Sequence, residues 1–156
     1  MRAWLAAVLL GAMTWLSALP ATAQDLKTFE KSAPFDDVKF DLTNAITNRG
    51  LVADFTGNVG GMLARTGRDV GSTKEIYKRS EYVVFCSAQL SREMMEADAA
   101  NAGYCPFVMF LYETAAAPGK VVVGYRKFPT DGNAASRKAF AAIETLLDGI
   151  AKEAVK

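Results

Sequence analysis

Two stretches of the chain carry apolar residues at helical spacing. In the first, apolar side chains recur three or four positions apart, which predicts an amphipathic helix with one face on a core. They are Phe35, Val38, Leu42, Ala45 and Ile46. Gly50 ends this helix, because glycine readily adopts the left-handed conformation that follows a helix C-terminus. The second stretch begins at about Ala134 and has the apolar stripe Phe140, Ile143, Leu147, Ile150 and Ala154.

Four or five other stretches are typical of β-strands, because they are rich in β-branched and aromatic residues between turn signals. They are residues 28–33, 51–56, 81–86, 106–113 and 120–128. The last two are joined by a five-residue connection that ends in Pro118-Gly119, which predicts an antiparallel hairpin. We therefore expect an α+β fold, a two-layer sandwich in which a mostly antiparallel sheet of four to five strands carries helices on one face. A doubly wound parallel sheet is disfavoured, since too few strand–helix–strand units alternate.

The segment 59–68 has two interpretations. Met62 and Leu63 suit a short helix, whereas Gly60, Gly61 and Gly67 suit a loose connection. Glycine-rich connections often carry binding sites, so a solvated connector and a binding loop both stay open.

Residues 1–23 have the three parts of a secretory signal peptide. Arg2 gives a positive start, residues 3–19 form an uncharged run, and Ala21-Thr22-Ala23 is a cleavage pattern. A retained membrane anchor is the alternative, but the run of 17 residues is at the short limit for a membrane span. We expect cleavage after Ala23 and a single mature domain over residues 24–156. The expected location is periplasmic or secreted, with no membrane attachment after cleavage.

Composition narrows the classes of function. Removing the signal segment takes away one of the 18 basic residues and none of the 17 acidic ones, so the mature chain has no net charge and nucleic acid is not an expected partner. The chain has no histidine, which excludes Ser-His-Asp and Cys-His catalysis, the usual zinc sites and axial-His haem ligation. No phosphate-binding or catalytic sequence motif occurs. We expect no cofactor and no metal, and the balance is against an enzyme.

The order of these elements resembles the domain-of-unknown-function 302 family. It runs from the helix FDDVKFDLTNAITNRGL through EYVVFC and CPFVMFLYE to VVVGYRKFP, over about residues 35–129. Its markers are Gly50, Phe85-Cys86, Cys105-Pro106 and Gly124-Tyr125-Arg126. The variant with paired cysteines, which includes Tyr77-Lys78-Arg79, is the closer likeness. The resemblance implies a compact, dimeric domain of sheet and helices, and it carries over no catalytic residue.

Cys86 and Cys105 are the only cysteines of the chain, and such a pair in an exported protein usually forms a disulfide. If the helix between them led into a parallel strand, they would lie roughly 16–20 Å apart at opposite sheet edges, too far to bond. If the helix ends near Asp98, residues 99–104 can return the chain to its starting edge. The strands are then antiparallel and the cysteines meet. We expect this disulfide, whose loop of about 20 residues would contribute roughly 3 kcal/mol.

A redox pair and a Cu(I) site are the other interpretations of this segment. A catalytic dithiol usually has the spacing CxxC, which is absent here. Cu(I) suits thiolates together with the thioethers of Met94 and Met95. Adjacent methionines on a helix point about 100° apart, however, which favours packing in the core. Glu93 and Glu96 have the spacing for paired acid–base groups, although an exposed helix face commonly carries such charges.

The function expected from these patterns is an exported small-ligand-binding or protein-binding accessory domain without catalytic activity. We expect a homodimer formed by apolar surface on the side of the sheet opposite the helices. The alternative is a thiol-dependent redox or Cu(I)-handling protein that uses Cys86 and Cys105. The candidate ligand contacts are Tyr77, Arg79, Met94, Tyr125 and Arg126.

Overall fold

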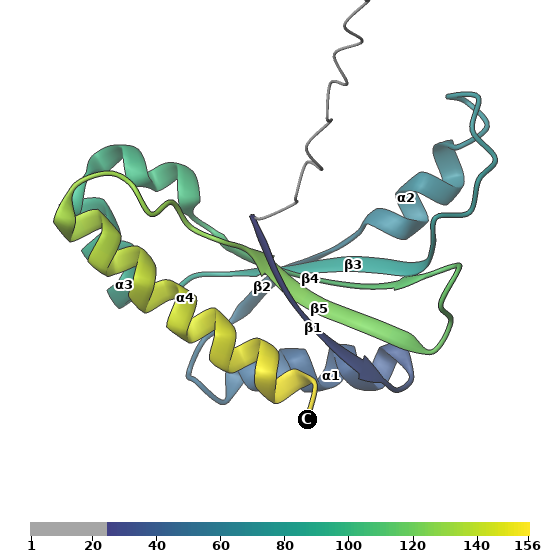
Figure 1. Cartoon of the computed structure of the whole chain (residues 1–156), viewed down its shortest axis with the longest axis horizontal. Coiled ribbons are helices and arrows are strands. Elements are labelled where there is room, and N and C mark those ends of the chain that lie inside the picture. The colour runs from purple at the N-terminus through teal and green to yellow at the C-terminus, as the bar shows by residue number, and fades with distance from the viewer. Residues whose placement is uncertain (1–24) are drawn as a thin grey trace, which may run out of the picture.

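The computed structural model describes residues 25–156, and the expected signal peptide lies outside this described part. Five strands form one antiparallel sheet in the order β1-β5-β4-β3-β2 (Figure 1). Their bounds are β1 (Leu26–Ser32), β2 (Ala53–Asn58), β3 (Tyr77–Phe85), β4 (Phe107–Thr114) and β5 (Lys120–Arg126). The predicted antiparallel α+β fold and its β4–β5 hairpin are confirmed.

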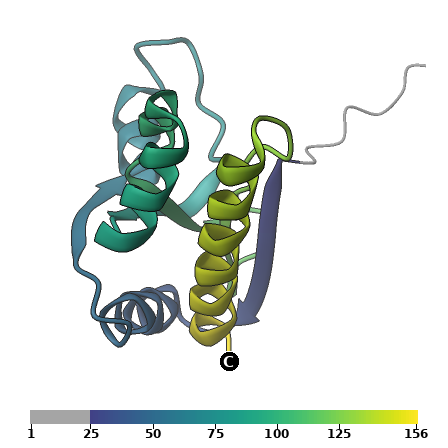
Figure 2. The same cartoon turned by 90° about the vertical axis from the view of Figure 1, so that its left-hand side faces the viewer.

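The helices divide between the two sides of the sheet. Their bounds are α1 (Phe35–Thr47), α2 (Val59–Thr66), α3 (Ala88–Ala97), the 3-10 helix η1 (Ala99–Tyr104) and α4 (Ala134–Ala154). The long helices α1 and α4 lie on one side together with α3, and α2 projects from the other side (Figures 1 and 2). Within residues 25–156, no helix combines the length and the apolar composition that crossing a membrane requires.

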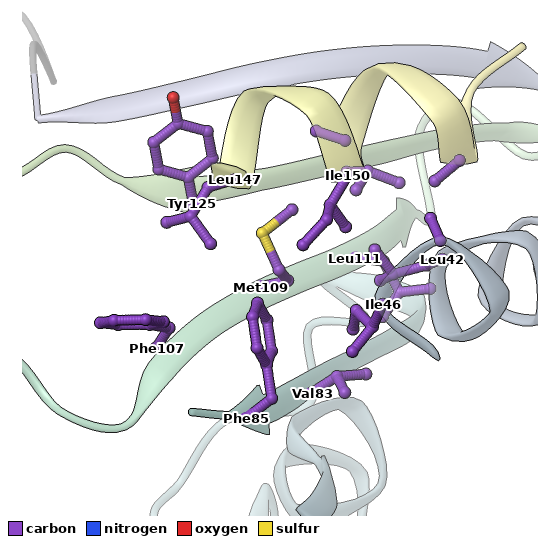
Figure 3. Packing of buried hydrophobic residues seen from close by; sticks show 14 of the residues in the cluster. Leu42, Ile46, Val83, Phe85, Phe107, Met109, Leu111, Tyr125, Leu147 and Ile150 are labelled. Atoms are coloured by element: carbon purple, nitrogen blue, oxygen red, sulfur yellow. The ribbon is translucent and has the colours of Figure 1, made fainter. Parts of the chain in front are cut away.

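The core lies between the sheet and the three helices α1, α3 and α4. Alternate residues of β3, β4 and β5 point toward the helices, as the two-residue period of a strand requires, and Figure 3 shows their side chains against those of α1 and α4. The labelled residues are Leu42, Ile46, Val83, Phe85, Phe107, Met109, Leu111, Tyr125, Leu147 and Ile150, all at most 1% exposed. Burying one such aliphatic or phenylalanine side chain stabilises the fold by roughly 1.5–3 kcal/mol.

Three local features concern the end of α1, the segment 59–68 and the start of β3. Gly50 has the positive φ of 72° that ends α1 as expected. The segment 59–68 contains the short helix α2, which Asn58 caps by accepting a hydrogen bond from the Gly61 amide (2.6 Å). Strand β3 begins at Tyr77 rather than Glu81, because its polar first residues still pair with the end of β4.

Candidate functional site

The two cysteines lie just beyond the ends of neighbouring strands. Phe85 pairs with Phe107 at the end of the β3–β4 ladder, so Cys86 leaves the sheet at the edge where Cys105 approaches it. Helix α3 ends at Ala97 and η1 turns the chain back to this edge. The Cys86 Sγ and Cys105 Sγ atoms are 3.2 Å apart, and both thiols are free in this structure. The predicted return of the chain is confirmed, and the bond itself stays a prediction.

A buried amide holds this turn in place. Asn101 is 7% exposed, and its Nδ2 donates to the Met94 carbonyl (2.9 Å) and to the Ser136 hydroxyl (2.8 Å). These bonds join the end of α3 and η1 to the first turn of α4. The Asp98 carboxylate also accepts a hydrogen bond from the Ala100 amide (2.9 Å). The turn that brings Cys105 back to the sheet is therefore held by polar contacts outside the sheet.

The environment of the pair disfavours a thiolate. Partial burial and the neighbouring Cys105 raise the pKa of the Cys86 thiol to about 11, so it is protonated and weakly nucleophilic near neutral pH. Met94 is fully buried in the core, in keeping with the packing role predicted for it. Within the described part of the chain, no three Cys, Asp or Glu side chains are grouped closely enough to hold a metal ion.

A cavity of about 380 Å³ lies at the end of the sheet where β1 and β4 begin and β5 ends. We call it the sheet-end pocket. Its aromatic wall comes from a cluster in which Phe128 lies 5.8 Å from Tyr104 and 6.2 Å from Phe107 between ring centroids. Arg126 and Lys127 are the charged residues of its lining, which contains no acidic side chain. The pocket therefore joins apolar surface to positive charge.

The five predicted ligand contacts do not form one site. Tyr77 pairs with Thr114 at one end of β4, whereas Tyr125 pairs with Met109 toward its other end. Arg126 lines the sheet-end pocket. Tyr77 lines a second cavity, of about 360 Å³, between α2 and the loop that follows it. Met94 lies in the core.

Arg79 is engaged by groups of its own chain. Its guanidinium contacts the carboxylates of Asp36 (3.0 Å) and Glu81 (2.9 Å), and it lies over the Phe35 ring, 4.3 Å from the ring centroid. Glu81 is 6% exposed and also pairs with Lys39 (2.5 Å). Burial alone would raise the pKa of Glu81, but the hydrogen bonds from Lys39 and Arg79 outweigh it and hold this pKa below its usual value. This network joins α1 to β3.

Tyr125 is similarly committed to the structure. Its ring packs in the core and its hydroxyl points away from Met109 (Figure 3), donating a hydrogen bond to Asp148 (2.6 Å). Lys27 pairs with the same carboxylate (2.5 Å). Burial, with the acceptor Asp148, raises the pKa of Tyr125 far above its usual value. Its hydroxyl therefore stays protonated and suits a structural bond rather than proton transfer.

The sheet side opposite α1, α3 and α4 is a surface that we call the open face. By strand alternation and pairing it carries Phe55, Tyr82, Val84, Val108, Phe110 and Tyr112. Two glycines make room for aromatic rings of neighbouring strands, because a Cβ on Gly57 would collide with Tyr82 and one on Gly124 with Phe110. Phe55 is 57% exposed and Val108 is 42% exposed. The open face is apolar and partly accessible.

Comparison with known proteins gives the family. Residues 27–154 match the family described as "Domain of unknown function DUF302". The chain belongs to the DUF302 family. A solved structure described as an uncharacterized conserved DUF302 protein from Bacillus stearothermophilus has the same fold, with a TM-score of 0.70 at 16% identity, over 86% of this chain and 100% of the other. No curated protein matches the chain.

The DUF302 resemblance predicted from sequence is confirmed, but several residues of the sheet-end pocket were missed. Leu26 begins β1, Tyr104 ends η1, and Lys127 and Phe128 follow β5. The strand predicted over residues 120–128 ends at Arg126, so Lys127 and Phe128 belong to the connection after it. Hydrophobic periodicity does not show which side chains meet at the ends of such elements. Only Arg126 among the predicted contacts lies in this pocket.

Proposed function

We propose that this DUF302 protein is an exported, non-catalytic binding domain whose open face binds a second copy of the chain. The open face supports this proposal because it is apolar and partly accessible, with Phe55 57% exposed and Val108 42% exposed. Export rests on the signal-like segment of residues 1–23. The absence of histidine and the self-paired state of Arg79, Glu81 and Tyr125 support a binding role over catalysis.

The chemistry of the open face suits a second copy. Strands β3 and β4 place no charged side chain among Val84, Val108 and Phe110. The charges of this face lie on β1 and β5, where Lys120 pairs with Glu30 (2.6 Å) and Arg126 lies at the end of the sheet. The apolar middle of two such surfaces can therefore meet without burying an unpaired charge. The rings of Tyr82 and Phe110 extend over Gly57 and Gly124, which keeps the face low enough for close packing against a flat partner. An apolar face of this kind is characteristic of protein interfaces.

The segment around α2 extends this surface. We call residues 59–76 the arm; it rises from the open side of the sheet (Figure 1), and α2 buries none of its side chains. Its apolar residues Met62, Val70 and Ile76 are 42%, 75% and 47% exposed. The strands alone give a flat area of roughly 550 Å², less than the ~800 Å² per partner of a stable interface. Contacts from the arm to the second copy would supply the difference.

Light scattering on the mature chain tests this proposal. We expect a dimer for the wild type and a monomer for the double variant Phe55→Asp/Val108→Lys, because two charges would be buried in the apolar interface. The matched control is Phe40→Asp, which changes a phenylalanine that is 66% exposed on α1, away from the open face. A monomeric wild type, or dissociation by the control alone, would contradict the proposal.

A second candidate function uses the cysteine pair in thiol chemistry or Cu(I) handling. The two sulfurs are 3.2 Å apart. This separation favours formation of a disulfide bond, because a shift of about 1 Å would bring the sulfurs to the ~2.05 Å of such a bond. Closure would transfer two electrons, with loss of two protons, to an oxidised thiol–disulfide carrier of the export compartment. The raised pKa of Cys86 favours a stable staple over a reactive couple.

Thiol titration of the natively exported protein separates these roles. A staple predicts no free thiol, and a Cys86→Ser variant that is less stable by roughly 3 kcal/mol but keeps its self-association. A redox or copper function instead predicts thiols that cycle, or one Cu(I) per chain whose binding is lost in the same variant. Detection of two free, copper-binding thiols would replace the binding-domain proposal with this second function.

A further inference from the structure

The sheet-end pocket has the form of a small-molecule site. Its volume of about 380 Å³ falls within the usual range for ligand pockets. Strand ends give it a fixed frame, since Leu26 pairs with Arg126 across β1 and β5. The end of η1 and the residue Phe128 after β5 close another side. The pocket is therefore built by several elements that the sheet already holds together.

One wall of the pocket is aromatic and partly accessible. Tyr104 is 41% exposed, and its ring lies 5.8 Å from that of Phe128 and 5.0 Å from that of Phe140. Val108 and Phe110 add apolar surface from the open face. Aromatic walls of this kind favour a planar apolar ligand, which can stack on a ring or meet its edge.

The charged part of the lining is positive and has no partner. Arg126 and Lys127 form no ion pair with any residue of 25–156, whereas Arg49, Arg79 and Lys27 are each paired with carboxylates. No Asp or Glu belongs to the lining. Two neighbouring cations beside an apolar cavity attract a ligand that has one anionic group and an apolar body.

We propose that the sheet-end pocket binds a small aromatic anion, an aryl carboxylate or sulfonate, with its ring against Tyr104 and Phe128 and its charge at Arg126 and Lys127. The proposal goes beyond self-association and does not depend on it. Because Val108 and Phe110 belong both to the pocket and to the open face, a second copy on the open face would lie beside the bound ligand.

A fluorescence titration with 1-anilinonaphthalene-8-sulfonate tests the site. The neutral N-phenyl-1-naphthylamine has a similar ring system without the sulfonate and reports apolar binding alone. We expect Arg126→Gln/Lys127→Gln to weaken sulfonate binding roughly tenfold, as the loss of two partly exposed charge contacts predicts, and to change binding of the neutral probe less than about twofold. The matched control is Arg65→Gln/Arg68→Gln, which removes two arginines of the arm and leaves the sheet-end pocket intact.

The outcomes separate this proposal from the proposed dimer. Sulfonate binding that is unchanged in Arg126→Gln/Lys127→Gln, or weakened equally by the arm control, overturns the pocket proposal. Equal loss of both probes, with the circular dichroism of the variant unchanged, overturns its anionic class. The titration is repeated with the single variant Phe55→Asp, which places one charge on the open face outside the pocket and should weaken self-association. It should give wild-type affinity for the probe; loss of binding there would assign the probe to the dimer interface instead.

Discussion

At the scale of single residues, the open face depends on Gly57 and Gly124, because a Cβ at either position would collide with an aromatic ring of that face. Gly124 lies on β5 beside β1 and β4, and a Cβ there would collide with the Lys27 carbonyl and with the Phe110 ring. The ring could move, but the backbone of β1 is held by its pairing with β5. Gly124 is thus required for close approach, although its φ is not positive.

The variant Gly124→Ala should therefore be destabilised by about 1–3 kcal/mol, the usual cost of overpacking. Chemical denaturation at a fixed protein concentration measures this change. Gly103→Ala is the control, because a Cβ at Gly103 meets nothing within 4 Å, and its stability should stay within about 0.5 kcal/mol of wild type. Equal stability of the two variants would show that Phe110 and β1 relax around the new methyl group.

The contribution of the single residue Glu81 to folding stability should depend on pH. Its pKa in the folded protein lies below the ordinary value of 4.5, so its contribution to stability is complete above that value and is lost as the pH falls through the folded pKa. We expect Glu81→Gln to be less stable by about 1–2 kcal/mol at pH 7, with the gap to wild type narrowing below about pH 4.5. Glu96→Gln, on an exposed pair, should show a small gap throughout. A gap for Glu81→Gln that is constant with pH would rule out this linkage.

At the scale of elements, predictability followed the strength of the local signal. Helices α1 and α4 were predicted because their apolar stripes repeat over several turns, and the β4–β5 hairpin because Pro118-Gly119 marks its turn. The beginning of β3 was not predicted, since Lys78 and Arg79 give no strand pattern and this end of the strand is held by the pairing of Tyr77 and Arg79 with β4. The two cysteines meet only because α3 ends at Ala97 and η1 turns the chain back. The sequence showed that such a turn was needed but not that it forms. The sheet-end pocket joins residues of five separate segments, so no local sequence pattern predicted it.

The turn from α3 into η1 provides a prediction for this scale. Asn101→Ala removes the two donated bonds that tie η1 to Met94 and Ser136, so we expect a loss of about 1–2 kcal/mol. Closure of the Cys86–Cys105 disulfide by oxidised glutathione should also slow several-fold, because the sulfurs are no longer held together. The control Asn48→Ala changes an exposed amide with one long contact and should alter neither quantity. A destabilised Asn101→Ala that closes its disulfide at the wild-type rate would assign the positioning of Cys105 to the strands alone.

At the scale of the whole molecule, one side of the sheet is covered by helices and the other by nothing in the described chain except the arm. This asymmetry links stability to self-association, because a second copy on the open face stabilises only the folded state. The melting temperature of the wild type should therefore rise by roughly 2–4 °C for each tenfold increase in protein concentration. Phe55→Asp/Val108→Lys should melt at a temperature independent of concentration, while Phe40→Asp should follow the wild type. Scanning calorimetry over a hundredfold range of protein concentration measures the effect. A wild-type melting temperature that is the same at every concentration would mean that the open face is stable in water without a second copy.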